Sequence, residues 1–313
     1  MGETALEAHG LAKAFGEIRA VEALDLVVPP GVVLGFLGPN GAGKTTAIRM
    51  LTTVLQPDAG TFTVAGVHHT RPIELRQRVG VLPESAGYPE RQTGEEFLLY
   101  HARLFGHTRG SARETARSLL AETGLTDRAS SAIGGYSRGM RQRLGIARAL
   151  VNEPAVVFLD EPTLGLDPSG QRQMLGLVRE IAEARGATVV LSTHLLAEVE
   201  EICGRVVILN RGRIVADGTV AEIVRRAAAP RQGRFSVPPE QAPHALEALR
   251  AQGLEATTNA RPGELDLALR AENSDDIVRA ALRALLDAGI PVIGLELEGG
   301  RLSDAFLAMT ERT

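Results

Sequence analysis

The chain has 313 residues, of which 44% are hydrophobic and 23% are charged, so it is long enough for about two globular domains. A net charge of -4 excludes strong overall attraction to nucleic acid. The single cysteine, Cys203, excludes an internal disulfide framework and favours a reducing compartment. The first ten residues lack the layout of a signal peptide, and no apolar run approaches the roughly 20 residues that span a bilayer. We therefore expect any work at a membrane to depend on a partner.

The first two thirds of the chain alternate apolar runs with helical patterns. This alternation is typical of an α/β fold with a substantial parallel sheet. Between residues 93 and 150 three helical patterns follow one another, beginning with Thr93 as N-cap and Glu96 as its capping-box partner. We expect a helical insertion there. The apolar runs that we interpret as strands are 24–28, 33–37, 61–65, 156–159, 188–191 and 206–209.

A change of composition at residues 227–233, "AAAPRQG", predicts a linker that closes a first domain at residue 226. Residues 234–313 follow a β-α-β-β-α-β order, which predicts a small ferredoxin-like α+β domain. This part of the sequence has no cluster of His, Cys or carboxylate residues with catalytic or metal-binding spacing. We therefore interpret it as a packing or dimerisation module.

The strongest local signal is the stretch "GFLGPNGAGKTT". Gly38, Gly43, Lys44 and Thr45 match the P-loop pattern, after an apolar strand and before a helix expected at about 44–55. Glycines allow backbone N–H groups to turn toward phosphate oxygens, and the helix N-terminus adds partial positive charge. We expect Lys44 to reach the β- and γ-phosphates and the Thr45 hydroxyl to bind Mg²⁺.

Polar residues follow two further apolar runs. Asp160 and Glu161 end the run 156–159, where Asp160 is suited to hold Mg²⁺ through water and Glu161 to polarise an attacking water. The alternative, an acidic strand end in solvent, is disfavoured by the P-loop. His194 follows the run 188–191 and would lie at the sheet edge where α/β proteins bind ligands. It could contact a γ-phosphate, or it could be structural.

With these pieces the chain resembles the ATP-binding subunits of ABC transporters over about residues 4–225. Six motifs stand in the family's order, and the segments "LPES" and "RGRIVADGT" and the small C-terminal domain resemble the subfamily that drives exporters, including drug and antibiotic efflux systems. The motifs are Phe15 for the adenine-stacking aromatic, "GPNGAGKTT" for Walker A, "YSRGM" for the signature, "VVFLDEP" for Walker B, "LGLDP" for the D-loop and "STH" for the H-loop.

The resemblance implies ATP and Mg²⁺ as cofactors and a head-to-tail dimer, expected to be a homodimer, with each ATP between Walker A of one chain and the signature of the other. It implies Glu161 as general base, His194 as switch and Asp167 as the link between the two sites. The partner would be a separate membrane permease, at the cytoplasmic face of the membrane, and not a nucleic acid. The implied ATP contacts are Phe15, Gly38, Pro39, Asn40, Gly41, Ala42, Gly43, Lys44, Thr45 and Thr46, with Ser137, Arg138, Gly139 and Met140 acting in trans.

The sequence departs from the family pattern at three positions. Arg138 replaces the first signature glycine and Met140 the glutamine, while Ser137 and Gly139 are kept. Arg138 is either a tolerated substitution or an extra cation near the phosphate. Glu84 occupies the Q-loop position, usually glutamine, where a carboxylate can still bind Mg²⁺ together with Thr45 and Asp160.

Two other classes stay open from the sequence. One is a soluble ATPase of the same type in translation or DNA maintenance, although such proteins usually carry two cassettes or a long coiled coil. The other is a P-loop kinase, GTPase or nucleotide-regulated binding module, although no guanine-reading motif is present. Tyr88 and Phe97, after Glu84, could line a groove for a permease helix or belong to the core. The transported substrate stays open, with drug-like or antibiotic export as the leading hypothesis.

Overall fold

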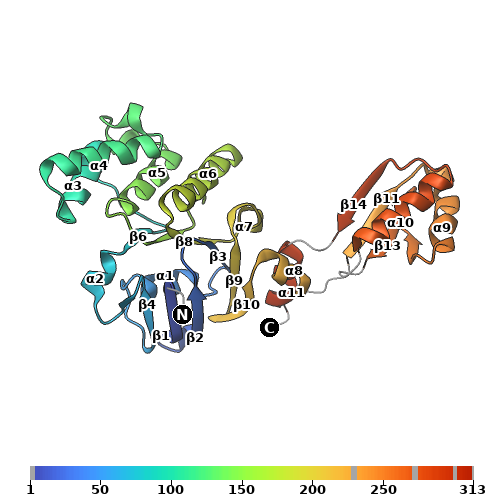
Figure 1. Ribbon diagram of the computed structural model, residues 1–313, viewed down its shortest axis with the longest axis horizontal. Coiled ribbons are helices and arrows are strands. Elements are labelled where there is room, and N and C mark those ends of the chain that lie inside the picture. Colours follow the sequence, from blue (N-terminus) through green and yellow to red (C-terminus); the bar gives the residue numbers. More distant parts are fainter. Residues whose placement is uncertain (1–3, 227–230, 270–273, 299–301, 312–313) are drawn as a thin grey trace. The chain divides into compact units, whose positions relative to one another are not determined.

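A computed structural model describes residues 4–226, 231–269, 274–298 and 302–311. The chain divides into two compact units, Met1–Val220 and Ala221–Thr313 (Figure 1). Among the residues that the structure describes, no helix combines the length and apolar character needed to cross a bilayer.

A six-stranded sheet forms the centre of the first unit. Its strand order is β10-β9-β3-β8-β7-β6, parallel throughout except for the antiparallel pair of β9 and β10. The structure confirms strands at four of the predicted apolar runs and adds β6 and β10, which the runs did not indicate. The strands are β3 (Val33–Leu37), β6 (Val79–Leu82), β7 (Val156–Asp160), β8 (Thr188–Thr193), β9 (Arg205–Asn210) and β10 (Arg213–Gly218).

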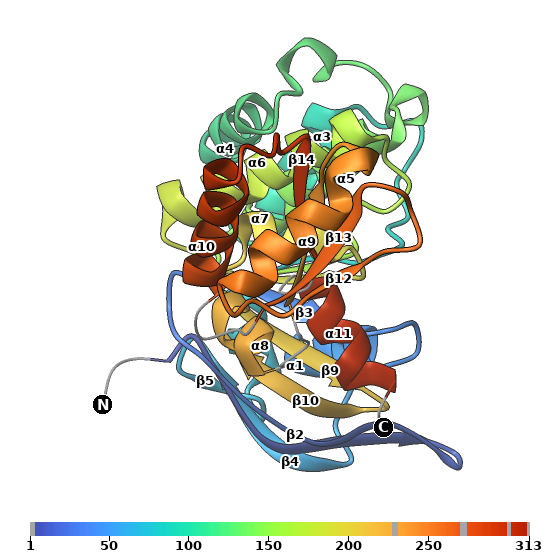
Figure 2. The same ribbon diagram turned by 90° about the vertical axis from the view of Figure 1, so that its right-hand side faces the viewer.

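A second, antiparallel sheet has the order β2-β1-β4-β5, and Figure 2 shows β2 and β4 in a layer apart from β9 and β10. The runs 24–28 and 61–65 belong to this sheet. One apolar core joins side chains of both sheets and α1, among them Leu24, Phe36, Met50 and Phe62. The elements are β1 (Leu6–Phe15), β2 (Ile18–Val28), β4 (Ala59–Val64), β5 (Val67–His68), α1 (Lys44–Leu51) and α2 (Pro72–Arg76).

Helix α1 is one turn shorter than the expected span of 44–55. The Thr52 hydroxyl donates to the Ile48 carbonyl at 2.7 Å, and Thr53 takes the left-handed conformation with φ 58°. A non-glycine residue in that conformation ends the right-handed helix.

The helical insertion is confirmed, with α3 (Gly94–Leu104), α4 (Arg109–Glu122) and α5 (Arg138–Ala149). Short 3₁₀ turns at Thr126–Arg128 and Ile133–Gly135 precede α5. Phe97 is buried, which favours the core interpretation for this residue, whereas Tyr88 is half-buried and donates its hydroxyl to the Arg141 carbonyl at 2.8 Å.

The predicted capping box at the start of α3 is present. The Glu96 amide donates to the Thr93 hydroxyl at 3.1 Å, and the Thr93 amide donates to the Glu96 carboxylate at 2.9 Å. Thr93→Ala removes one of these bonds and is expected to lower the free energy of unfolding by about 1 kcal/mol. Urea unfolding of the full chain measures this, and Thr93→Ser, which keeps the hydroxyl, is the control. Equal loss in both variants would contradict a capping role.

Helices α6 (Pro168–Arg185) and α7 (Leu196–Ile202) complete the first unit, which ends near the start of α8 (Val220–Arg226). Gly186 closes α6 in the left-handed conformation with φ 60°.

The second unit contains an antiparallel sheet of order β12-β13-β11-β14 with α9 and α10 in the connections. Its core includes Phe235, Leu249, Leu265 and Leu285. The linker prediction was wrong at its C-terminal end, because residues 231–233 pair with β13 as part of β11. Residues 227–230 lie outside the described residues. The elements are β11 (Arg231–Ser236), α9 (Ala242–Ala251), β12 (Ala256–Thr258), β13 (Glu264–Leu269), α10 (Ser274–Asp287), β14 (Gly294–Glu298) and α11 (Leu302–Glu311).

Candidate functional site

The loop between β3 and α1 has glycine where the neighbouring backbone leaves no room for a side chain. A Cβ atom on Gly43, which has φ 104°, would lie 2.2 Å from the Ala20 carbonyl oxygen. A Cβ atom on Gly38 would lie 2.5 Å from the Leu209 carbonyl oxygen. Both glycines are therefore fixed by β2 and β9 as well as by the conformation of the loop itself.

Lys44, the first residue of α1, is buried and folds back over this loop. Its Nζ donates to the Gly38 carbonyl at 2.7 Å and to the Pro39 carbonyl at 3.4 Å. Burial lowers the pKa of Lys44, and the nearby carboxylates of Glu161, Asp160 and Glu84 oppose that change. The Lys44 amine is therefore bonded to two backbone carbonyls of the loop and lies near three carboxylates.

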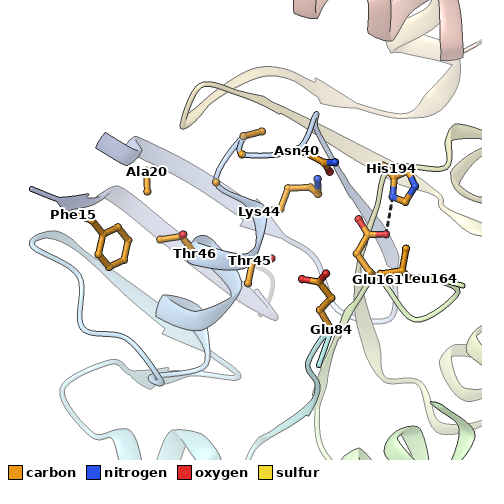
Figure 3. A pocket seen from close by; sticks show the side chains of 13 residues that line it. Phe15, Ala20, Asn40, Lys44, Thr45, Thr46, Glu84, Glu161, Leu164 and His194 are labelled. Atoms are coloured by element: carbon orange, nitrogen blue, oxygen red, sulfur yellow. Dashed lines mark hydrogen bonds and ion pairs between the residues drawn. The ribbon is translucent and has the colours of Figure 1, made fainter. Parts of the chain in front are cut away.

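A pocket of about 640 Å³ opens above the loop (Figure 3). Phe15 lies at one end and His194 at the other, with Lys44 and Thr45 between them. Leu164 and Ala20 also line it. Leu164 is the first residue of the D-loop motif, but no sequence pattern marks Ala20, which faces the pocket because β2 packs there. The predicted residues in the lining are Phe15, Asn40, Gly41, Ala42, Gly43, Lys44, Thr45, Thr46, Glu84, Glu161 and His194.

At the end of β7, Glu161 turns into the pocket. Its φ is 51°, a left-handed conformation that costs a non-glycine residue about 1–2 kcal/mol. The amide of Glu161 donates to the Ser192 carbonyl at 2.9 Å, and its carboxylate oxygen Oε2 lies 2.9 Å from Nδ1 of His194. The hydrogen bond to strand β8 holds Glu161 in this strained conformation. The conformation places Glu161 next to His194, which belongs to a separate sequence motif.

Asp160 is suited to a cation. Within the described part of the chain its Oδ1 is buried and has no hydrogen-bond partner, which is unusual for a carboxylate. Asp160 is not among the residues that line the pocket, but Thr45 and Glu84 are, and so is its neighbour Glu161. No group of three or more His, Cys, Asp or Glu among the described residues forms a metal site by itself. This oxygen donor set fits Mg²⁺, which protein carboxylates commonly hold jointly with substrate phosphates.

The signature residues and Asp167 do not line the pocket. Ser137 caps α5, accepting a hydrogen bond from the Met140 amide at 3.2 Å, and Asp167 caps α6, accepting one from the Gly170 amide at 3.3 Å. Arg138 and Glu84 both line a second cavity of about 290 Å³, so Glu84 belongs to both cavities. The fold thus gathers the Walker A, Walker B, Q-loop and H-loop residues and leaves the signature helix start outside their pocket.

The parallel sheet, the glycine loop at the end of β3 and the carboxylates at the end of β7 define a P-loop nucleoside triphosphatase. Comparison with known proteins narrows this class. The profile of the family described as "ABC transporter" matches residues 21–164. The daunorubicin/doxorubicin resistance ATP-binding protein DrrA of Streptomyces peucetius is 38% identical over 307 residues, which cover 98% of this chain and 92% of the relative.

Further similarities include a curated relative and a solved structure of the same fold. The Nod factor export ATP-binding protein I of Paraburkholderia xenovorans is 39% identical over 225 residues, which cover 72% of this chain and 74% of the relative. An ATP-binding cassette solved as a dimer in a post-hydrolysis state with ADP and Pi has a TM-score of 0.63 at 22% identity, covering 68% of this chain and 98% of the other. The chain belongs to the ABC transporter ATP-binding proteins. It is an ABC ATPase, of the class that hydrolyses ATP to drive transport.

Proposed function

We propose that this chain is the ATP-hydrolysing subunit of an exporter and works with a separate membrane permease. The observation that carries the proposal is the pocket in which the P-loop, Glu161 and His194 meet. The export role is supported by the relative that is named for Nod factor export. The relative that is named for daunorubicin and doxorubicin resistance supports a drug-like or antibiotic substrate.

ATP would lie along the pocket from Phe15 toward His194. Phe15 is about half exposed (51%) at the pocket mouth, where its ring offers a face for the adenine to stack on. Lys44 would donate hydrogen bonds to the β- and γ-phosphates in place of the Gly38 and Pro39 carbonyls that it contacts now. The amides at the start of α1 add donors and partial positive charge there.

Glu161 would accept the proton of the attacking water, and His194, at 2.9 Å, would hold this carboxylate in place and contact the γ-phosphate. Thr45, Asp160 and Glu84 are the residues that would hold Mg²⁺. When bound, Mg²⁺ supplies charge neutralisation on the phosphates. The chain itself contributes mainly positioning and electrostatics.

A second copy of the chain would complete each site in trans. Ser137 and Gly139 stand at the N-terminus of α5, outside the chain's own pocket, where amides and the helix field suit a phosphate. Arg138 and Met140 would approach with them, and Asp167 would link the two sites. The cassette of the same fold whose structure was solved as a dimer with ADP and Pi supports this arrangement.

The second unit would be a ferredoxin-like module for packing or dimerisation. Its strand order and the helices between β11 and β12 and between β13 and β14 support that assignment. The whole chain would act at the cytoplasmic face of the membrane, held there by the permease.

Purification of the tagged full-length chain from its own cells in mild detergent tests the role. The expected result is stoichiometric recovery of a multi-span membrane protein, and ATP turnover by the purified complex. The control is the same extract prepared from cells that express the chain without a tag. Recovery with ribosomes or DNA in place of a membrane protein would favour the soluble class and contradict the proposal.

A further inference from the structure

The side chain of Arg138 packs on the D-loop of its own chain. A Cβ atom built on Gly165 would lie 2.8 Å from both Cζ and Nε of Arg138 and 3.0 Å from its Nη1. Gly165 also has φ 72°, a backbone conformation that favours glycine, and a side chain at this position would have to displace the guanidinium. The planar group thus lies flat against the backbone at this residue, a contact suited to arginine.

The next residue of the signature, Gly139, also lies near the D-loop. A Cβ atom on Gly139 would lie 3.7 Å from Cδ2 of Leu166, in ordinary van der Waals range. Two consecutive residues at the start of α5 therefore lie beside two consecutive residues of the D-loop, with the Arg138 side chain on Gly165 and the Gly139 backbone near Leu166.

The touched segment leads directly to the proposed base. The amide of Leu164 donates to the Glu161 carbonyl at 3.2 Å, and the amide of Leu166 donates to the Thr163 carbonyl at 3.1 Å. These two overlapping turns connect residues 161–166, and Gly165 lies within the second turn. The connected segment begins at Glu161, which contacts His194, and Asp167, which caps α6, follows it directly.

Electrostatics alone does not account for the position of Arg138. It is the first residue of α5, where the helix field disfavours a cation, and the first turn has no acidic residue. Glu84 and Glu90 line the cavity beside it, together with the cation of Arg141, yet the guanidinium lies on Gly165. Packing against the D-loop is the contact that the structure gives this side chain.

We propose that Arg138 is a positioning residue that holds the signature helix against the D-loop. The signature residues that would contact the ATP of a second copy and Glu161 of the chain's own site would then move together. This inference rests on the proposed ATP site. It replaces the two sequence-based interpretations of Arg138, a tolerated substitution or a cation that binds phosphate directly.

Two variants separate these roles. Arg138→Gly removes the side chain, and Arg138→Lys keeps the charge but not the planar group. If Arg138 holds the D-loop in place, both variants are expected to raise amide hydrogen exchange at Leu164 and Leu166 at least threefold in the nucleotide-free full chain. Exchange in α1 should stay unchanged. In the complex with its permease, both lower kcat for ATP at least fivefold while KM stays within twofold.

Other outcomes overturn the proposal. Rescue of turnover by Arg138→Lys, with a raised KM in Arg138→Gly, identifies a phosphate-binding cation. Wild-type exchange and turnover in both variants identify a tolerated substitution. If the wild-type complex does not hydrolyse ATP, the proposed function fails instead. The exchange measurement needs no turnover, so it tests the Arg138 contact in either case.

A second substitution checks the same contact from the other side. In the wild-type background, Gly165→Ala is expected to lower kcat at least tenfold. In the Arg138→Gly background the loss should be clearly smaller, because only the backbone strain at residue 165 remains once the guanidinium is absent. Equal losses in the two backgrounds would show that Arg138 and Gly165 act independently and would overturn the proposal.

Discussion

Glu161→Gln is expected to lower kcat for ATP hydrolysis by about 100- to 10,000-fold, the range for loss of a general base. ATP affinity should stay unchanged, because glutamine has the same shape and can keep a hydrogen bond to His194, now 2.9 Å from Oε2. The substitution would also replace the buried carboxylate of Glu161, near Lys44, with a neutral amide. The variant should therefore bind ATP and retain it.

Phosphate release and binding of a fluorescent ATP analogue, measured on the same preparation, check this prediction. Glu153→Gln is a matched control, since Glu153 also has a left-handed backbone, with φ 47°, and is exposed and outside the pocket. Glu153→Gln should hydrolyse ATP at the wild-type rate. Turnover by Glu161→Gln close to that of the control would remove Glu161 from the role of base.

Lys44→Ala is expected to weaken ATP binding by about 100-fold or more, because two charge-assisted hydrogen bonds to phosphate would be lost. In the structure, Nζ already lies on the loop, bonded to Gly38 and Pro39, so little rearrangement is needed to reach a phosphate. The fold should tolerate the change, since burial lowers the pKa of Lys44 and its ammonium is held there at a desolvation cost.

Isothermal titration with ATP in the presence of Mg²⁺ measures this loss, and thermal unfolding shows whether the variant is folded. Arg49→Ala removes a cation from the exposed face of the same helix and should bind ATP normally. If Lys44→Ala is folded and binds as tightly as Arg49→Ala, the lysine does not contact the phosphates.

Most residues that line the pocket could be predicted because the motifs that contain them are encoded locally. Lys44 and Thr45 open a helix directly after a strand and a glycine loop, and Asp160 ends another strand with Glu161 directly after it, so short spacing places each residue. The capping box of Thr93 and Glu96 was predictable for the same reason, since both bonds join residues within one helix turn.

Other features could not be predicted because their causes are distant in the chain. Residues 231–233 have the composition of a linker but become strand because β13 pairs with them. Ala20 lines the pocket because β2 packs beside the P-loop, and no property of alanine indicates that. Leu55 lies beyond α1 because Thr53 turns left-handed before it.

The sequence by itself determined the family and the phosphate loop and predicted the reacting groups, because these depend on residue types at fixed short spacing. The tertiary structure decided which of these groups meet. Glu161 contacts His194 because β7 and β8 are neighbours in the parallel sheet, and Arg138 covers Gly165 because the signature helix starts beside the D-loop. Contacts of this kind arise from packing between elements, which local spacing does not specify.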